Sequence, residues 1–373
     1  MREIKIASIS DIHLGHRRTP ASEIIKNLYL AFPDNAETAD LDIIFLAGDV
    51  FDEVLHLSDD DVWEINVWVS NFLRLCKKHD ILVRVLEGTP SHDRKQSKIF
   101  PTVNASANIG ANLKYVTAIS IEYIQELDKT VLYVPDEATP TTEETYSQVT
   151  EMLKARGLDK VDFAVMHGQF EFHLPPFIKA PKHNSEQYLN LVKYLIFVGH
   201  IHQHSVVERI ITHGSFDRLC HGDEAPKGHV RVSLWENGEY SIKFVENFDA
   251  KKYVTINCEN LEIEDTLNLI GLRVKDLKEN SYVRIEANSD NPIFTNIDTL
   301  VSLYPTLVWS KSTIEAKSEE KQISEEETLY EPILLTKENL TTLLIERVKR
   351  SFTNEKILSS INQILNEVEN ELN

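Results

Sequence analysis

The sequence predicts an α/β fold, because short apolar strands alternate with amphipathic helices and polar residues follow the strand ends. Residues 43–47 illustrate the pattern: a continuously apolar run stops at Gly48 and is followed at once by Asp49. Its length and apolar continuity indicate a buried strand of a parallel sheet rather than a helix. The turn at Gly48 places Asp49 at the carboxyl end of the strand, where open α/β sheets bind ligands.

Composition limits the class of protein. The 373 residues suffice for two ordinary domains and a tail, and 42% hydrophobic residues fit a soluble globular chain. The net charge of −20 argues against nonspecific adhesion to nucleic acid over the whole surface, although it allows a local basic patch.

The cysteines and the apolar runs predict a cytoplasmic protein. Cys76, Cys220 and Cys258 are widely spaced and odd in number, so they indicate neither a disulfide framework nor a zinc ribbon. A strand begins at Ile4, which leaves no room for a signal peptide. No apolar run approaches the roughly 20 residues that span a membrane, so we expect no membrane association.

Three strands separated by helices are expected in the first part of the chain. A strand over residues 4–9 runs into Asp11 and His13, which point to the same side of an extended segment. A helix over 20–32 precedes the strand that ends at Asp49, and a third strand over 81–86 ends in residues 87–93. Between them a long amphipathic helix is expected over 58–79, with an apolar side formed by Trp63, Val67, Phe72 and Leu75.

Further strands are expected in the next part of the chain. Strands between 115 and 134 turn near Asp128, and a helix over 141–156 begins with the capping-box pair Thr141 and Glu144. A strand over 161–166 ends at His167, and one over 195–198 ends at Gly199. Residues 206–212, 230–235 and 240–245 should add three successive antiparallel strands and close the first domain near residue 248.

The remaining residues divide into a small module, a linker and a tail. We expect a first domain over 1–248 and a smaller α/β module over 249–312, with strands at 253–256 and 282–286 and a helix at 263–270. Residues 313–336 are an acidic linker, and 337–373 are a helical tail. An apolar stripe on such a tail packs either on its own domain or on a partner; its place after a linker favours docking.

Five predicted strands end in residues that bind metals or transfer protons. These residues are Asp11 with His13, Asp49, His92 with Asp93, His167, and His200 with His202. Carboxylate and imidazole ligands without thiolates suit manganese, iron or zinc. Two cations roughly 3.5–4 Å apart clamp a phosphate and activate a water, and a carboxylate such as Asp49 can bridge them.

In their order, these motifs resemble those of the calcineurin-like metallophosphoesterases over residues 11–202. The resemblance implies a four-layer αββα sandwich with Asp11, His13 and His202 on the first metal and Asp49 bridging. His167 and His200 would hold the second metal, with His92 as general acid and Asp93 orienting it. The family's Gly-Asn-His-Asp motif is altered here to residues 88–93, Gly-Thr-Pro-Ser-His-Asp, so Ser91 is the nearest substitute for the asparagine ligand. An inactive relative with a structural metal is the alternative.

Within that superfamily, the chain is most similar to the SbcD family of DNA-repair nucleases. This similarity is carried by residues 11–15, 48–52 and 214–218, the last together with Glu224 and Lys227. It implies a Mn²⁺-dependent nuclease (Fe²⁺ or Zn²⁺ being alternatives) that acts on DNA as an exonuclease and endonuclease. The small module would cap the site, and the tail would dock on an SMC-like ATPase of the SbcC type.

Basic residues follow two of the motifs and are expected to contact DNA. They are Arg17, Arg18, Arg94, Lys95 and Lys98. Positive charge beside the metals would attract a phosphate backbone, although these residues also suit ordinary solvated loops. The long helix near Trp63 and Trp68 is either core or a homodimer face, and the resemblance favours a homodimer. A phosphatase or small-molecule phosphodiesterase, or a scaffold that binds DNA and an ATPase without cutting, are the competing functions.

Overall fold

Two six-stranded sheets form the frame of the protein in its computed structural model, which describes residues 3–56, 59–175 and 177–314. The first sheet contains β1 (Glu3–Ile9), β2 (Ile43–Ala47), β3 (Leu82–Leu86), β4 (Leu113–Val116), β11 (Gly228–Trp235) and β12 (Tyr240–Glu246). The second contains β5 (Ser120–Ile124), β6 (Lys129–Val134), β7 (Val161–His167), β8 (Val192–Gly199), β9 (Ser205–Val207) and β10 (Ile210–Thr212). Both sheets are mixed, and the prediction of an α/β fold is confirmed.

The strands that carry the motifs are parallel neighbours within each sheet. The first sheet has the order β12-β11-β1-β2-β3-β4, and β1 to β4 run parallel. The second has the order β5-β6-β7-β8-β10-β9, and β6, β7 and β8 run parallel. Parallel strands end at one edge of a sheet, so the residues after β1, β2 and β3 meet, as do those after β7 and β8.

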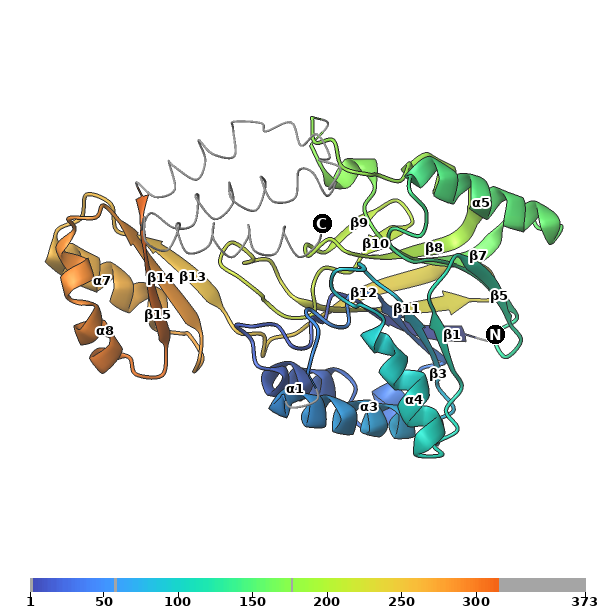
Figure 1. Ribbon diagram of the computed structural model, residues 1–373, viewed down its shortest axis with the longest axis horizontal. Coiled ribbons are helices and arrows are strands. Elements are labelled where there is room, and N and C mark those ends of the chain that lie inside the picture. The colour runs from blue at the N-terminus through green and yellow to red at the C-terminus, as the bar shows by residue number, and fades with distance from the viewer. Residues whose placement is uncertain (1–2, 57–58, 176, 315–373) are drawn as a thin grey trace, which may run out of the picture. The chain divides into compact units, whose positions relative to one another are not determined.

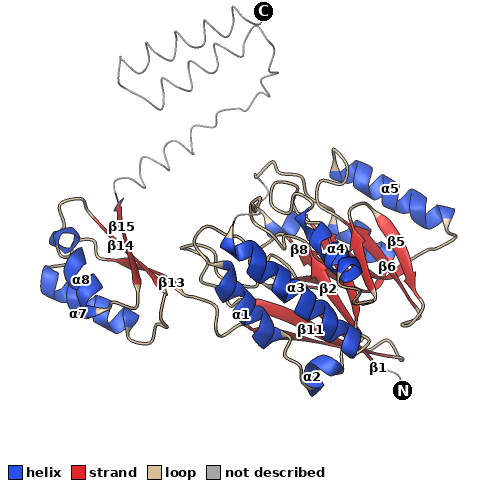
Figure 2. Cartoon of the chain, turned by 60° about the horizontal axis from the view of Figure 1, so that its bottom comes forward, coloured by secondary structure: helices blue, strands red, loops and turns tan. Residues whose placement is uncertain are grey.

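Three layered hydrophobic cores hold this frame together. Helices α1 (Ala21–Ala31), α3 (Asp60–Lys78) and α4 (Ile99–Ser106) pack on the outer face of the first sheet, while α2 (Ala36–Ala39) is a single turn. Helices α5 (Thr142–Ala155) and α6 (Ser185–Leu191) pack on the outer face of the second. Between the sheets lies a core that includes Phe45, Phe163 and Phe197. Figures 1 and 2 show α1, α3 and α4 on one side of the frame and α5 on the other.

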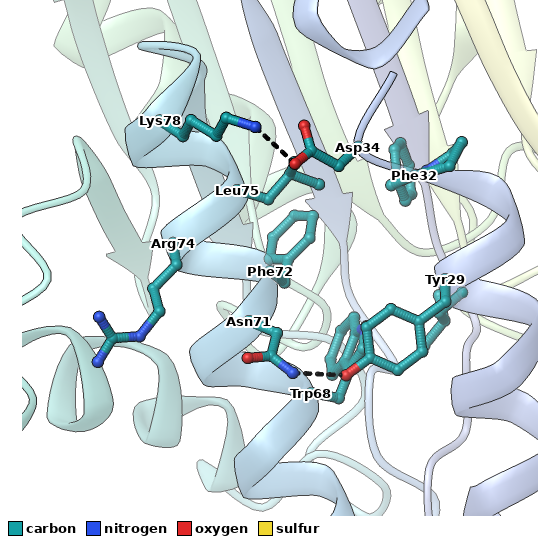
Figure 3. A pocket seen from close by; sticks show the side chains of 11 residues that line it. Tyr29, Phe32, Asp34, Trp68, Asn71, Phe72, Arg74, Leu75 and Lys78 are labelled. Atoms are coloured by element: carbon teal, nitrogen blue, oxygen red, sulfur yellow. Dashed lines mark hydrogen bonds and ion pairs between the residues drawn. The ribbon is translucent and has the colours of Figure 1, made fainter.

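The apolar side of α3 differs from the prediction. Trp63 is 74% exposed and Val67 is also exposed, whereas Trp68, Phe72 and Cys76 are buried. Residues 65, 68, 69, 72, 73 and 76 follow the 3–4 spacing of one helix face, and this face turns Trp63 outward. Beside it, α1 and α3 enclose an apolar groove of about 450 Å³, rimmed by a hydrogen bond from Asn71 to Tyr29 (Figure 3).

The strands expected over 206–245 do not form one antiparallel extension. The chain turns at Glu208, which has a φ of +52°, so β9 and β10 make a hairpin on the second sheet, where β10 lies parallel to β8. In contrast, β11 crosses to the first sheet and pairs antiparallel with β1, with β12 at its outer edge. The sequence pattern predicted the strands at 230–235 and 240–245 but read the hairpin of β9 and β10 as a single strand over 206–212, and it did not indicate the sheet to which each strand belongs.

A third sheet follows the first two. Strands β13 (Tyr253–Asn257), β14 (Tyr282–Ala287) and β15 (Val308–Thr313) are parallel, and α7 (Ile263–Val274) and α8 (Ile297–Leu303) lie on the same side of them (Figure 2). They enclose their own core around Ile285 and Leu300. Hydrogen bonds tie this module to the preceding residues, among them Thr19 to Tyr253 (3.3 Å) and Arg218 to the carbonyl oxygen of Ala250 (3.2 Å). Strand β15 includes Thr313, the first residue of the predicted linker; the rest of the linker from 315 and the tail lie outside the described residues.

Candidate metal centre

The strand ends bring six of the predicted ligands into two groups. Asp11, His13 and His202 form a first trio, whose three ligand atoms all lie within 4.8 Å of one another. Asp49, His167 and His200 form a second trio that meets the same criterion. Asp11, His13 and Asp49 come from the first sheet, and the other three residues come from the second. Each trio therefore spans both sheets. Asp49, which was expected to bridge the two metals, is grouped with His167 and His200.

The first trio has the spacing of ligands that share a cation. The Nε2 atoms of His13 and His202 face each other at 3.1 Å, and Nε2 of His202 lies 3.7 Å from Oδ1 of Asp11. Two nitrogens bound at about 2.1 Å and roughly a right angle to one cation lie about 3 Å apart. Burial lowers the pKa of His13, but the hydrogen bond to Asp52 and the charges of Asp11 and Asp49 outweigh this, so the pKa is raised. The pocket thus favours positive charge.

The second trio is oriented from behind by the backbone. Nδ1 of His167 donates to the carbonyl oxygen of Ala47 at 2.7 Å, which leaves Nε2 to face Oδ2 of Asp49 at 3.2 Å. Burial opposes ionisation of Asp49, yet the charge and hydrogen bond of His167 hold the pKa of this carboxyl well below its usual range. A ring nitrogen fixed by a hydrogen bond on its other nitrogen is the usual arrangement of a metal-bound histidine.

Several ligand residues are held in a sparsely populated backbone conformation. Asp11, His13 and Asp49 have φ near +50°, and His200 has a φ of +92°. Left-handed conformations of non-glycine residues cost free energy and concentrate at functional sites. A side chain at Gly48 would place its Cβ 2.2 Å from Nδ1 of His167, so only glycine allows the two sheets to approach here.

Thr89, rather than Ser91, lies at the second trio. The Ser91 side chain is exposed and lies outside both trios. The hydroxyl of Thr89 lies 3.2 Å from Oδ2 of Asp49, 3.3 Å from Nδ1 of His200 and 3.4 Å from Nε2 of His167. Its backbone N–H also donates to Oδ1 of Asp49 at 2.6 Å. The chain turns away after Thr89, because Ser91 and His92 belong to a tight turn closed by hydrogen bonds to the Thr89 carbonyl oxygen.

Asp93 does not contact His92, contrary to the predicted role. Its carboxylate accepts the backbone N–H groups of Gly88 (2.7 Å), Phe51 (2.9 Å) and Asp49 (3.2 Å), so it ties the loops after β2 and β3 together. Burial and the nearby Asp49 raise the pKa of Asp93 to about 7. The sequence placed Asp93 next to His92, but the side chains of adjacent residues point in different directions.

Asp52 takes the orienting position that was expected for Asp93. Its Oδ1 lies 2.9 Å from Nδ1 of His13 and 3.6 Å from Nδ1 of His92, and its carbonyl oxygen accepts from the same His92 nitrogen at 3.2 Å. Burial opposes ionisation of Asp52, but its hydrogen bond to His13 and the neighbouring histidines lower its pKa. His13, Asp52 and His92 could also hold a cation. The His13 hydrogen bond instead explains this group as the outer support of the first trio.

Of the five basic residues expected to contact DNA, two line one pocket and three do not. Arg17 and Arg94 line an open basin of about 450 Å³ together with Asp52 and His92. Arg17 pairs with Glu53 at 2.7 Å. Arg18, Lys95 and Lys98 are exposed but do not line this basin.

Two further charged residues support the site and were not recognised in the sequence. Lys227 is fully buried, and its ammonium donates to the backbone carbonyl of His202 at 2.7 Å and to the Asp223 carboxylate. Asp136 follows β6, and its Oδ2 lies 3.2 Å from the Thr89 hydroxyl and 3.7 Å from Nδ1 of His200. The strand-end position of Asp136 was the available signal, whereas Lys227 was noted only as part of the resemblance to the SbcD family and was given no role in the site.

Comparisons with known proteins identify no family. Neither a family model nor a curated protein matches this chain. Among solved structures, TT1561 of Thermus thermophilus aligns at 12% identity over 65% of this chain and 99% of its own, with a TM-score of 0.37. Another solved chain aligns at 12% identity over 65% of this chain and 99% of its own, with a TM-score of 0.39. Within the described ranges, no helix is long and apolar enough to cross a membrane.

Proposed function

We propose that this protein is a two-metal phosphodiester hydrolase that cleaves DNA. The observation that carries the proposal is the pair of adjacent Asp/His trios, each assembled from both sheets. The two trios adjoin, since the Asp11 carboxylate accepts the backbone N–H of His200 at 3.0 Å. The order of layers, helices outside two packed sheets, supports the finer assignment to a metallophosphoesterase sandwich. Asp49 is the proposed bridge between the cations.

Two divalent cations, Mn²⁺ in this proposal and Fe²⁺ or Zn²⁺ as alternatives, would neutralise charge on the phosphate and lower the pKa of an attacking water. The protein's own residues orient the proposed metal ligands and protonate the departing sugar oxygen. His92 is partly exposed, and its Nδ1–H donates to the carbonyl oxygen of Asp52, which leaves Nε2 for the departing sugar oxygen. Asp52 holds His13 in the tautomer that presents Nε2 to the first site. Thr89 supplies a neutral oxygen at the second site in place of an asparagine amide.

The open basin favours a polymer over a small phosphate ester. It adjoins His92, and its lining includes Arg17 and Arg94 as well as Asp52 and Glu53, of which Glu53 pairs with Arg17 at 2.7 Å. Arg94 forms no ion pair among the described residues, so its guanidinium is the group offered to a phosphodiester backbone beside the proposed metals.

Two macromolecular partners belong to the same proposal. An SMC-like ATPase of the SbcC type would bind the tail over 337–373, which lies outside the described residues. A second copy of the chain would pack on α3, where Trp63 and Val67 expose apolar surface next to the groove between α1 and α3. Replacing Trp63 with Lys should shift the mass measured by light scattering from dimer to monomer. A mass that is the same in the wild type and the variant would count against this dimer face.

One experiment separates the candidate functions. Purified full-length protein with measured Mn²⁺ content is given linear duplex DNA and, separately, bis(p-nitrophenyl) phosphate. We expect both to be hydrolysed, and Asp49→Asn to abolish both activities while Asp128→Asn, which removes a carboxylate charge at the β5–β6 turn, leaves them unchanged.

Two other outcomes would support the competing functions. Cleavage of the small diester but never of DNA, even with the ATPase partner, would make the protein a small-molecule phosphodiesterase. No cleavage of either substrate at full metal occupancy would leave a DNA- and ATPase-binding scaffold.

A further inference from the structure

A pocket of about 130 Å³ adjoins the second trio, and the proposed hydrolysis does not use it. His200 forms part of its wall, and Asp136, Gly168 and His183 line it together with the beginning of α5. Asp136 belongs to both places, because its Oδ2 lies 3.2 Å from the Thr89 hydroxyl. We call this space the side pocket; a ligand in it would lie next to whatever the second trio binds.

His183 is a buried histidine whose ring has no hydrogen-bond partner among the described residues. It is 7% exposed, and its Nδ1 is enclosed without a donor or acceptor. The ring packs edge-on against Tyr188, with centroids 5.3 Å apart, and burial lowers its pKa to about 4, so it is neutral near pH 7. A neutral imidazole carries its proton on one of the two ring nitrogens, and we assign it to Nε2, since the enclosed Nδ1 has no acceptor for a proton. His183 thus offers a donor.

Gly168 lies between this donor and an acceptor, the carboxylate of Asp136. A Cβ built on Gly168 would lie 3.4 Å from Nε2 of His183 and 3.4 Å from Oδ1 of Asp136. The absence of a side chain there leaves a space flanked by one N–H and one carboxylate oxygen. Oδ1 of Asp136 already accepts the backbone N–H of Glu137 at 3.0 Å and, as a carboxylate oxygen, can accept a second donor, so a ligand edge that presents an acceptor beside a donor could pair with both groups.

The size and the remaining walls define the ligand class. A cavity of about 150 Å³ holds one benzene ring, so the side pocket suits a single six-membered ring rather than a fused pair of rings. Pro135, Pro140 and Pro181 contribute apolar surface to its walls. Asp136 and Glu137 make the pocket unsuitable for a phosphate. Pyrimidine bases combine a flat six-membered ring with a carbonyl or ring-nitrogen acceptor next to an N–H donor.

We propose that the side pocket takes one unpaired pyrimidine base of the nucleic-acid strand whose phosphate lies at the two trios. This inference rests on the proposed function for the identity of its ligand. His183 donates to an acceptor on the base, Asp136 accepts from the neighbouring N–H, and the prolines cover the ring. Reading a base by hydrogen bonds to its pairing edge requires that the base leave the duplex stack. The preferred substrate is therefore a strand with single-stranded pyrimidines near the cut.

Binding is measured without metal and without backbone charge, so that the carboxylates of the trios do not repel the strand. Fluorescent octamers with uncharged methylphosphonate linkages, made of thymidine, cytidine, adenosine or abasic units, are titrated with full-length protein in EDTA and followed by anisotropy. We expect the two pyrimidine strands to bind about tenfold more tightly than the other two, the effect of one to two hydrogen bonds. His183→Phe keeps the packing on Tyr188 and should remove the preference, whereas His79→Phe, remote at the end of α3, should keep it.

Equal affinities for all four octamers, or a preference that persists in His183→Phe, would overturn the inference. If His183→Phe does not fold, the comparison of thymidine with abasic octamers on wild-type protein decides. Ordinary phosphodiester thymidine strands with Mn²⁺ test the proposed function separately. A pyrimidine preference without cleavage refutes the nuclease and retains the pocket, while cleavage without the preference does the reverse.

Discussion

Replacing Asp52 with Asn tests how the first trio is held. Asp52 accepts from Nδ1 of His13 at 2.9 Å, and the side chains are only 13% and 2% exposed, so solvent screens the pair little. A hydrogen bond to a charged acceptor contributes about 1.5–3 kcal/mol, and one to a neutral amide oxygen about 0.5–1.5 kcal/mol. The difference, about 1–2 kcal/mol, corresponds to roughly a tenfold loss of Mn²⁺ affinity at the first site.

The assay is a calorimetric Mn²⁺ titration of wild-type and variant protein, with diester hydrolysis at saturating Mn²⁺ as a second readout. We expect one of the two binding events to weaken about tenfold and turnover to fall in parallel. Glu53→Gln is the matched control, because it neutralises the next carboxylate, which pairs with Arg17 on the surface. If Asp52→Asn binds both ions as tightly as wild type, Asp52 does not orient His13 for metal binding.

Three further changes have defined outcomes. His92→Ala should abolish turnover while the Mn²⁺ content measured by mass spectrometry stays the same; loss of metal would show that His92 is a ligand. Thr89→Val keeps the side-chain volume but removes the hydroxyl, so Mn²⁺ titration should show the second site weakened about tenfold, and an unchanged isotherm would contradict a role as ligand. Burial lowers the pKa of His229 to about 3, below that of an unfolded histidine, so the folded state resists protonation and His229 favours folding above about pH 6.5. This contribution is lost as the pH falls toward 3. The free energy of unfolding is measured in urea between pH 3 and 6.5. His229→Phe should reduce its slope against pH by about 1.4 kcal/mol per pH unit. An unchanged slope would show that His229 does not resist protonation in the folded state.

Residues tied to strand ends were predictable from the sequence. Asp11, Asp49, His167 and His200 follow short apolar strands, and parallel strands end at a common edge, so pattern and topology together bring them into contact. Asp11 is grouped with His13 and His202, and Asp49 with His167 and His200, whereas the bridging role of Asp49 stays a prediction. This prediction required only the direction of each strand. A short apolar run indicates the strand, and the glycine or polar residue after it indicates the carboxyl end.

Residues in loops were not predictable in the same way. Ser91 and Asp93 were assigned by their distance in sequence from His92, but the turn after Thr89 directs Ser91 to solvent and Asp93 to backbone amides. The same limit applies to Asp52, whose role depends on two histidines that come from different loops. Similarly, the hairpin of β9 and β10 and the crossing of β11 depend on which sheet has a free edge, which no local pattern records.

Each trio joins the two sheets, so its members come from distant parts of the chain. His13 and His202, for example, are 189 residues apart in sequence. Neither proposed site exists until both sheets have formed and docked, so a cation that fills it binds the finished frame and not its parts. At a thousandfold excess over its dissociation constant, such an ion stabilises the docked state by about 4 kcal/mol. On this proposal, bound manganese should also slow proteolysis of the protein, because it stabilises the docked state.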